Sequence, residues 1–100
     1  MNILVVDDEK DIQPLFQQRF RKEIRNGEVK FEFAYSGEEA LQFLSNYQHE
    51  AVLILSDINM PGMTGIDLLK IIKEEYSHIP VVVITAYDDA KNRMAAYRNG

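Results

Sequence analysis

The sequence contains no cysteine among its 100 residues. This absence excludes disulfide bonds, zinc–thiolate centres and a thiol nucleophile. The apolar runs are far too short to span a bilayer, and the start Met1-Asn2-Ile3 lacks the basic region and long apolar stretch of a signal peptide. We therefore predict a cytoplasmic protein with no membrane partner.

Basic residues are fewer than acidic ones. The sequence has 11 lysines and arginines and 16 aspartates and glutamates, which give a formal net charge of -5. Phosphate contacts need a basic face, so this balance disfavours nucleic-acid binding by the chain alone. The hydrophobic fraction of 46% favours a folded globule over a disordered chain. There is no internal repeat or linker, and the length suits one domain spanning residues 1–100.

Short apolar segments alternate with amphipathic ones along the chain. The apolar segments predict strands, at residues 3–6, 30–35, 51–55 and 80–85. The amphipathic segments predict helices, at residues 11–26, 36–47, 64–76 and 88–98. This alternation predicts an α/β fold in which a parallel sheet carries helices on both faces.

Polar residues at the segment borders predict where the helices begin and end. Asp11 is expected to cap a first helix that Asn26-Gly27 ends, with an apolar face formed by Ile12, Leu15, Phe16, Phe20 and Ile24. Capping-box spacing is present in Ser36-Gly37-Glu38-Glu39, and again between Thr64 and Asp67. Each box predicts the first turn of a helix.

The end of the chain does not match a complete fold of this class. Val81-Val82-Val83-Ile84 is apolar on both faces, which suits an inner strand, yet no fifth strand follows it. Asn99-Gly100 is typical of a helix C-terminus. We expect that a terminal strand and helix are missing, and that the exposed fourth strand could support self-association.

Two apolar runs end in carboxylates, Ile3 to Glu9 at Asp7-Asp8 and Leu53 to Gly62 at Asp57. If the runs are neighbouring parallel strands, about 4.8 Å apart, these carboxylates meet at one edge of the sheet. Such a cluster needs a cation or a shared proton. The first loop has no glycine to cradle a phosphate, so a dinucleotide site or P-loop is excluded. An acidic loop instead suits Mg²⁺.

A carboxylate beside magnesium can also be a nucleophile toward phosphorus and form an aspartyl phosphate. Thr85, at the end of the fourth predicted strand, is placed to donate a hydroxyl hydrogen bond to a phosphoryl oxygen. Phosphorylation would add roughly -1.5 to -2 charge at this edge.

Three blocks of sequence carry a resemblance to a known family. They are Val5-Val6-Asp7-Asp8-Glu9, Leu55-Ser56-Asp57-Ile58-Asn59-Met60-Pro61-Gly62-Met63-Thr64-Gly65, and Pro80-Val81-Val82-Val83-Ile84-Thr85-Ala86. In this order and at these spacings, they resemble the receiver domain of two-component response regulators over essentially the whole chain. The resemblance implies a flavodoxin-like doubly wound sheet of order 2-1-3-4, with the fifth strand missing.

The resemblance also implies roles for the acidic residues. Asp57 would accept a phosphoryl group from a sensor histidine kinase or a phosphotransfer protein. Asp8 and Asp57 would bind Mg²⁺ directly, together with the backbone carbonyl of Asn59, and Asp7 would assist through a water molecule. Phosphorylation would then switch the interaction with an output domain or effector protein.

Further roles fall on residues beside this site. Thr85 would be the switch hydroxyl and Ala86 would leave room for its movement, whereas Asn59 and Tyr87 would flank the site and influence phosphoryl lifetime. The family places a lysine after the fifth strand, and this lysine is absent from the chain. Lys91 is no substitute, because it falls within the last predicted helix.

Two other functions compete with phosphoacceptor signalling. A phosphohydrolase of the haloacid dehalogenase type also uses an aspartyl nucleophile, but needs a second aspartate where this chain has Asn59. A truncated receiver-like module could act by binding or oligomerisation, without being competent for phosphorylation. His49 and His78 are predicted to be surface residues, and neither has metal-ligand spacing.

Overall fold

The computed structural model describes residues 1–47, 49–50 and 53–84. These residues form eight elements, in the order β1 (Asn2–Val6), α1 (Ile12–Arg19), α2 (Arg21–Arg25), β2 (Lys30–Ala34), α3 (Gly37–Tyr47), β3 (Leu53–Asp57), α4 (Gly65–Glu75) and β4 (Val81–Ile84). The predicted helix over residues 88–98 lies outside the described residues.

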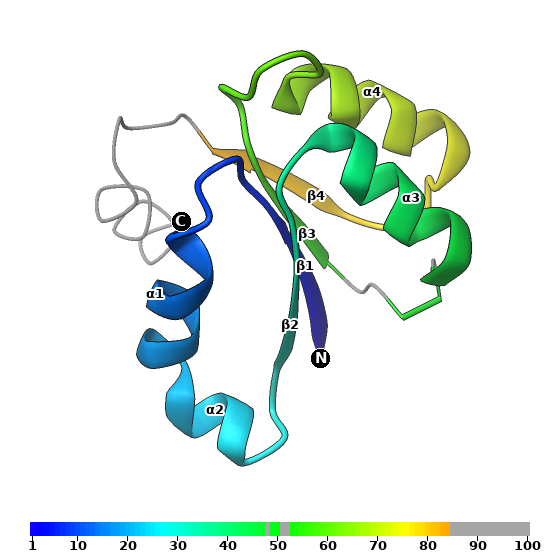
Figure 1. The fold of residues 1–100 in the computed structure, drawn as a ribbon. Helices are drawn as coiled ribbons and strands as arrows, with labels where there is room; N and C mark the ends of the chain where they lie inside the picture. The colour runs from blue at the N-terminus through cyan, green and yellow to red at the C-terminus, as the bar shows by residue number, and fades with distance from the viewer. Residues whose placement is uncertain (48, 51–52, 85–100) are drawn as a thin grey trace.

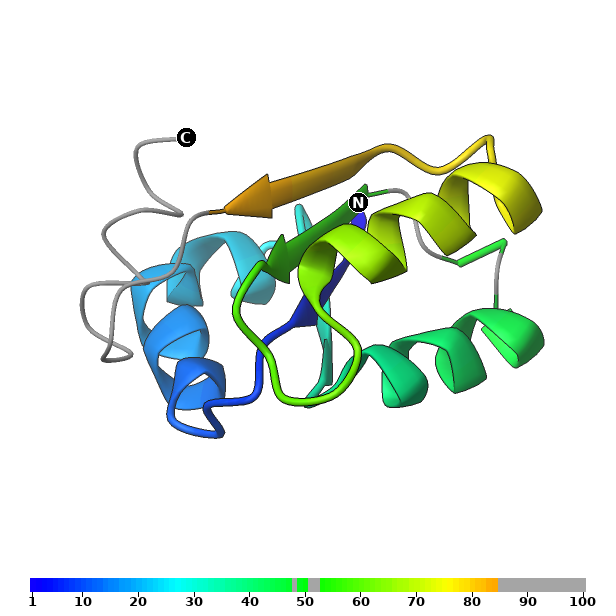
Figure 2. The same ribbon diagram turned by 90° about the horizontal axis from the view of Figure 1, so that it is seen from above.

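The strands form one parallel sheet in the order β2-β1-β3-β4, as predicted. Helices α1 and α2 cover one face of the sheet, and α3 and α4 cover the other (Figures 1 and 2). Within the described part of the chain, β4 pairs only with β3, and its four residues are half-buried. No helix among the described residues is long and apolar enough to cross a bilayer.

Strand β1 supplies side chains to both cores because alternate residues of a strand point to opposite faces. Ile3 and Val5 pack with α1 residues, in a cluster that includes Phe16. Leu4 and Val6 pack on the other face, in a second cluster with residues of α3 and α4. Its continuous apolar run therefore reflects a strand that is buried on both sides.

The first predicted helix is interrupted, and the prediction of one helix to residue 26 is wrong. Phe20 separates α1 from α2 with φ -108° and ψ 28°, which are not helical values. Its ring packs against Phe16 and Phe31, with centroids 5.7 and 5.3 Å away. Ile24 in α2, by contrast, is 37% exposed. Little burial of apolar side chains therefore holds α2 in line with α1. Gly27, at φ +76°, ends α2 as predicted.

The prediction that the Asp11 side chain caps the first helix is also wrong. Asp11 has φ -68° and ψ -13°, and its side chain makes no capping hydrogen bond. An N-cap residue normally has an extended backbone, which aims its side chain at the first free amides. Here the turn before α1 is closed by the backbone instead, because the Ile12 amide donates to the Glu9 carbonyl at 3.1 Å.

The two predicted capping boxes have different outcomes. At α4, the Asp67 amide donates to Thr64 Oγ1 and the Thr64 amide donates to Asp67 Oδ2, at 3.2 and 3.1 Å, so this box is complete. At α3, the Glu39 amide donates to Ser36 Oγ at 3.1 Å. The Glu39 carboxylate, however, accepts from the Tyr35 amide at 3.2 Å, one residue before the position that a capping box requires.

Candidate functional site

Asp7, Asp8 and Asp57 meet at the edge of the sheet where β1 and β3 end. Each offers one carboxylate oxygen, and these oxygens all lie within 4.8 Å of one another. The side-by-side register of β1 and β3, in which Val6 pairs with Ser56, places the two strand ends together. Asp7 and Asp57 are buried, at 0% and 1% exposure, whereas Asp8 is half-buried and faces partly toward solvent.

Asp7 is fixed by the backbone around it. Its amide donates to the Ala34 carbonyl at 3.0 Å, which extends the contact between β1 and β2 past the end of β1. Its Oδ1 accepts a hydrogen bond from the Glu9 amide at 2.9 Å. This side-chain-to-backbone turn is a common conformation of aspartate after a strand, and it orients the carboxyl group toward the site.

Asp57 is the last residue of β3, two residues beyond the predicted end of that strand. The strand continues past Leu55 because its pairing with β4 runs on from Ser56–Val83 to Asp57–Ile84. The Ile58 amide then donates to the Ile84 carbonyl at 3.1 Å. The Asp57 Oδ1 accepts from the Asn59 amide at 3.3 Å, so the loop after β3 also positions this carboxylate.

Gly65 and Ser56 support Asp57, and neither was predicted from the residues to have a site role. The Gly65 amide donates to the Ile58 carbonyl at 2.9 Å, and a Cβ at residue 65 would overlap the backbone of Asp57 and Ile58. The buried Ser56 hydroxyl donates to the Asp57 carbonyl at 3.1 Å. A glycine directly after the capping residue Thr64 was the available signal, because glycine permits close backbone approach.

The chemistry of this donor set fits a hard divalent cation. Three carboxylates supply only oxygen ligands, and magnesium prefers one or two carboxylates with water or phosphoryl oxygens in the remaining positions. At separations under 5 Å the three negative charges repel one another, and a cation would offset this repulsion. The acidic group therefore suits a magnesium-assisted reaction of a phosphoryl group.

The remaining predicted site residues are only partly described. Asn59 is exposed and follows Asp57 closely, with its amide bound to the Asp57 carboxylate. Thr85, Ala86, Tyr87 and Lys91 lie outside the described residues, so their predicted roles remain predictions.

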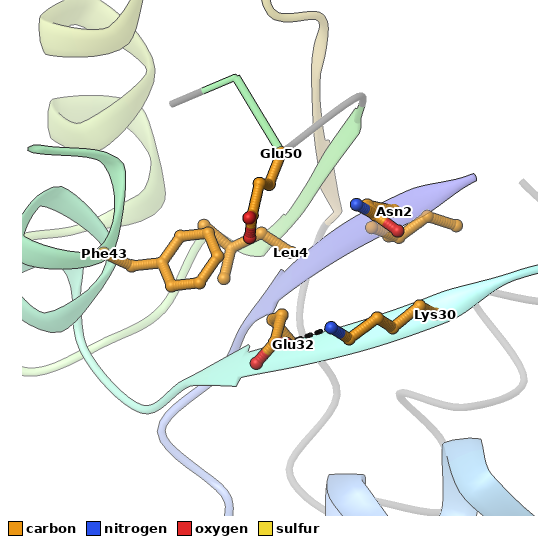
Figure 3. Close-up of a pocket in the computed structure, with 7 residues that line it drawn as sticks. Asn2, Leu4, Lys30, Glu32, Phe43 and Glu50 are labelled. Carbon is orange, nitrogen blue, oxygen red and sulfur yellow. Dashed lines mark ion pairs between the residues drawn. The ribbon is translucent and has the colours of Figure 1, made fainter. Parts of the chain in front are cut away.

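A pocket at the opposite edge of the sheet does not serve this site. It lies where β1 and β2 begin, beside Asn2 and Lys30, and the side chains of Phe43 and Glu50 project into it (Figure 3). Its volume is about 10 Å³, which is room for about one water molecule. Lys30 Nζ lies 3.6 Å from Glu32 Oε1 along its wall, in an exposed ion pair.

The comparisons with known proteins agree with the geometry of the acidic site. The family described as "Response regulator receiver domain" matches residues 3–100. The DNA-binding transcriptional regulator NtrC of Proteus hauseri is 36% identical over 99 residues, which are 99% of this chain and 20% of that protein. The heme response regulator HssR of Staphylococcus epidermidis is 32% identical over 100 residues, which are 100% of this chain and 42% of that protein. The chain thus spans about a fifth of the first of these curated relatives and about two fifths of the second.

A solved structure shows the same likeness. The response regulator protein TrrA from Thermotoga maritima, in complex with Mg²⁺ and BeF, has a TM-score of 0.70 and 30% sequence identity. The match covers 96% of this chain and 78% of that chain.

Proposed function

The chain belongs to the response regulator receiver family of two-component signalling, and on this premise we propose that Asp57 is the phosphoacceptor. One observation carries the proposal. Asp57 ends β3 nearly fully buried, and its carboxylate shares the sheet edge with those of Asp7 and Asp8, within 4.8 Å. Receiver domains are signalling phosphoacceptors, and these three residues form the acidic pocket of this one.

The proposed donor is a phosphohistidine of a sensor histidine kinase or of a phosphotransfer protein. A carboxylate oxygen of Asp57 forms the new P–O bond, while the P–N bond to the donor imidazole breaks and its electron pair returns to nitrogen. The Asn59 amide donates to Asp57 Oδ1 at 3.3 Å and so orients the carboxylate for this step. The backbone bond from Ile58 to Ile84 fixes the strand end during this step.

Asp8 and Asp57 would hold Mg²⁺ directly, with the backbone carbonyl of Asn59, and Asp7 would act through a water molecule. The all-oxygen donor set supports this assignment, as does the solved relative that contains Mg²⁺ and BeF. When bound, the ion would neutralise charge on the transferring phosphoryl group. Asp8 is the most accessible of the three acids, which suits a residue that must exchange water for an incoming ion.

The response to phosphorylation is expected at Thr85, whose hydroxyl would move toward the new phosphoryl oxygens while Ala86 leaves room for it. Asn59 and Tyr87 would influence how long the phosphoryl group persists. The readout would be an altered interaction with an output domain or effector protein. A cytoplasmic location stays a prediction.

Phosphorylation of Asp57 is tested with a small phosphodonor such as phosphoramidate, in the presence of Mg²⁺. We expect one phosphoryl group per chain, detected by intact-mass spectrometry, and loss of this modification in Asp57→Asn. Asp11→Asn is the matched control, because Asp11 is exposed and its side chain caps no helix. Phosphorylation that persists in Asp57→Asn, or that never occurs in the unaltered protein, contradicts the proposal.

A further inference from the structure

The two histidines of the chain lie beside each other, although different connections carry them. His49 lies in the connection between α3 and β3, and His78 in that between α4 and β4. Their ring centroids are 6.5 Å apart, with an angle of 31° between the ring planes, and both residues are exposed. The sequence contains only these two histidines. The fold therefore gathers all of its imidazole groups at one point.

We propose that His49 and His78 together bind a divalent transition-metal ion of the zinc type. Imidazole nitrogen is a favoured ligand of zinc, nickel and copper. Zinc lies about 2.0–2.1 Å from each nitrogen, so two imidazoles that share one tetrahedral ion have ring centroids roughly 5 Å apart. The observed separation of 6.5 Å is about 1.5 Å wider than this, so the rings must approach each other to share the ion. Exposed side chains change rotamer freely, so small χ rotations bring both nitrogens onto one ion.

The protein supplies two ligands to this site. Within residues 1–47, 49–50 and 53–84, the acidic triad is the only group of three or more potential metal ligands. Glu50 follows His49 directly, but its carboxylate extends toward Leu4 and Phe43, into the small pocket (Figure 3). Water would fill the other positions of a tetrahedral ion. A site of this kind exchanges its metal readily.

Ligand chemistry separates this site from the acidic triad. The two connections precede β3 and β4, so the histidines lie at the edge where strands begin, whereas Asp57 ends β3. Magnesium is a hard ion that prefers oxygen ligands, and it has little affinity for imidazole. An excess of Mg²⁺ should therefore occupy the acidic triad, where we propose that it binds, and leave the histidines available for zinc.

A metal ion held by both histidines links two connections that are distant in sequence. The unfolded chain does not hold His49 and His78 together, so the ion binds the folded state preferentially. Zinc should then raise the unfolding temperature in proportion to the logarithm of its concentration above Kd. Two neighbouring imidazoles that bind no common ion would give no such effect.

The experiment is a zinc titration of the protein in excess Mg²⁺, followed through the imidazole signals in NMR spectra and through thermal unfolding. We expect the signals of His49 and His78 to shift together with one dissociation constant, and the unfolding temperature to rise. His49→Gln and His78→Gln should each lower the zinc affinity on the order of a hundredfold, which is the gain from joining two ligands on one scaffold. Glu50→Gln, in the same connection as His49, should retain the affinity.

Three results would overturn the proposal. The first is a zinc affinity that stays the same in both glutamine variants. The second is a titration in which only one histidine responds. The third is a loss of zinc binding in Asp8→Asn, which would place the ion at the acidic triad. Both histidines are exposed, so the glutamine variants should keep the unfolding temperature of the unaltered protein in metal-free buffer, and this comparison checks that they fold.

Discussion

Gly65 begins α4 directly against the backbone of Asp57. A Cβ at residue 65 would overlap the Asp57 carbonyl oxygen and would lie 2.9 Å from Ile58 Cα. Backbone atoms cannot move aside as the end of a flexible side chain can, so a larger residue must displace either the helix or the strand end. The first residue of α4 thus limits where the backbone of Asp57, the proposed phosphoacceptor, can lie.

Gly65→Ala should therefore lower both stability and phosphorylation. Overpacking of this kind costs about 1–3 kcal/mol, and the displaced Asp57 carboxylate should slow modification by phosphoramidate. Chemical denaturation and intact-mass spectrometry measure the two effects. Gly27→Ala is the control, because a Cβ there meets no atom within 4 Å and only the positive φ of +76° opposes it. Gly27→Ala should lose stability but retain the phosphorylation rate of the folded protein. If phosphorylation were slowed equally in both variants, the proposed role of Gly65 would be refuted.

Mg²⁺ should stabilise the protein through the acidic triad. A ligand at a hundredfold excess over its Kd adds about 2.7 kcal/mol to the free energy of unfolding. Asp8→Asn removes one negative ligand and should reduce the rise in unfolding temperature at a given Mg²⁺ concentration. Asp11→Asn, which alters an exposed aspartate outside the triad, should leave the rise unchanged. Equal responses in the two variants would exclude Asp8 as a ligand.

The capping box of α4 should make stability depend on pH. The Thr64 amide, which donates to the Asp67 carboxylate, lowers the pKa of Asp67 below its ordinary value of 3.8, and the Thr64 hydroxyl and Lys70 lower it further. A lowered pKa means that the carboxylate stabilises the fold above pH 3.8, and that this contribution is lost as the pH falls through the folded-state pKa.

Asp67→Asn should accordingly lower the unfolding temperature at pH 7, and the difference from the unaltered protein should shrink as the pH falls below 3.8. Glu74→Gln, in the same helix but outside its first turn, should show no such change with pH. If the difference in unfolding temperature between Asp67→Asn and the unaltered protein were constant from pH 7 to pH 3, the Asp67 carboxylate would not be the source of the pH dependence.

Thr64→Ala removes the other half of the box and should cost about 1 kcal/mol of stability. The cost arises because the Asp67 amide loses its hydrogen bond to Thr64 Oγ1. Urea denaturation should show a lower midpoint with an unchanged slope. Ser45→Ala should change the midpoint little, because the Ser45 hydroxyl donates to the Gln42 carbonyl of its own helix and caps no free amide.

The sequence was sufficient to predict the parallel α/β fold and the acidic site, because both follow from local patterns. The run Ile3 to Val6 must be buried on both faces, and carboxylates that follow neighbouring parallel strands must meet at one edge. The pattern could not reveal the interruption at Phe20, since the spacing of apolar residues continues through it. That interruption depends on the packing of the Phe20 ring against Phe16 and on the exposure of Ile24, and both are set by tertiary structure.

Contacts between distant connections were equally inaccessible. His49 and His78 have no regular spacing, and only the arrangement of α3 and α4 on one face brings their rings together. The prediction of a cap at Asp11 was wrong for a related reason. Residue type indicated a cap, but Asp11 has helical backbone angles, which do not aim its side chain at the first free amides of α1.

The hydrogen bond from the Gly65 amide to the Ile58 carbonyl closes the loop after Asp57 at its base. Pro61 and Gly62, at its tip, are exposed to solvent. A loop tied at its base transmits little of a change in its length to the strand that precedes it. We therefore expect that residues can be inserted at the tip of this loop, to change the surface beside the acidic site without moving Asp57.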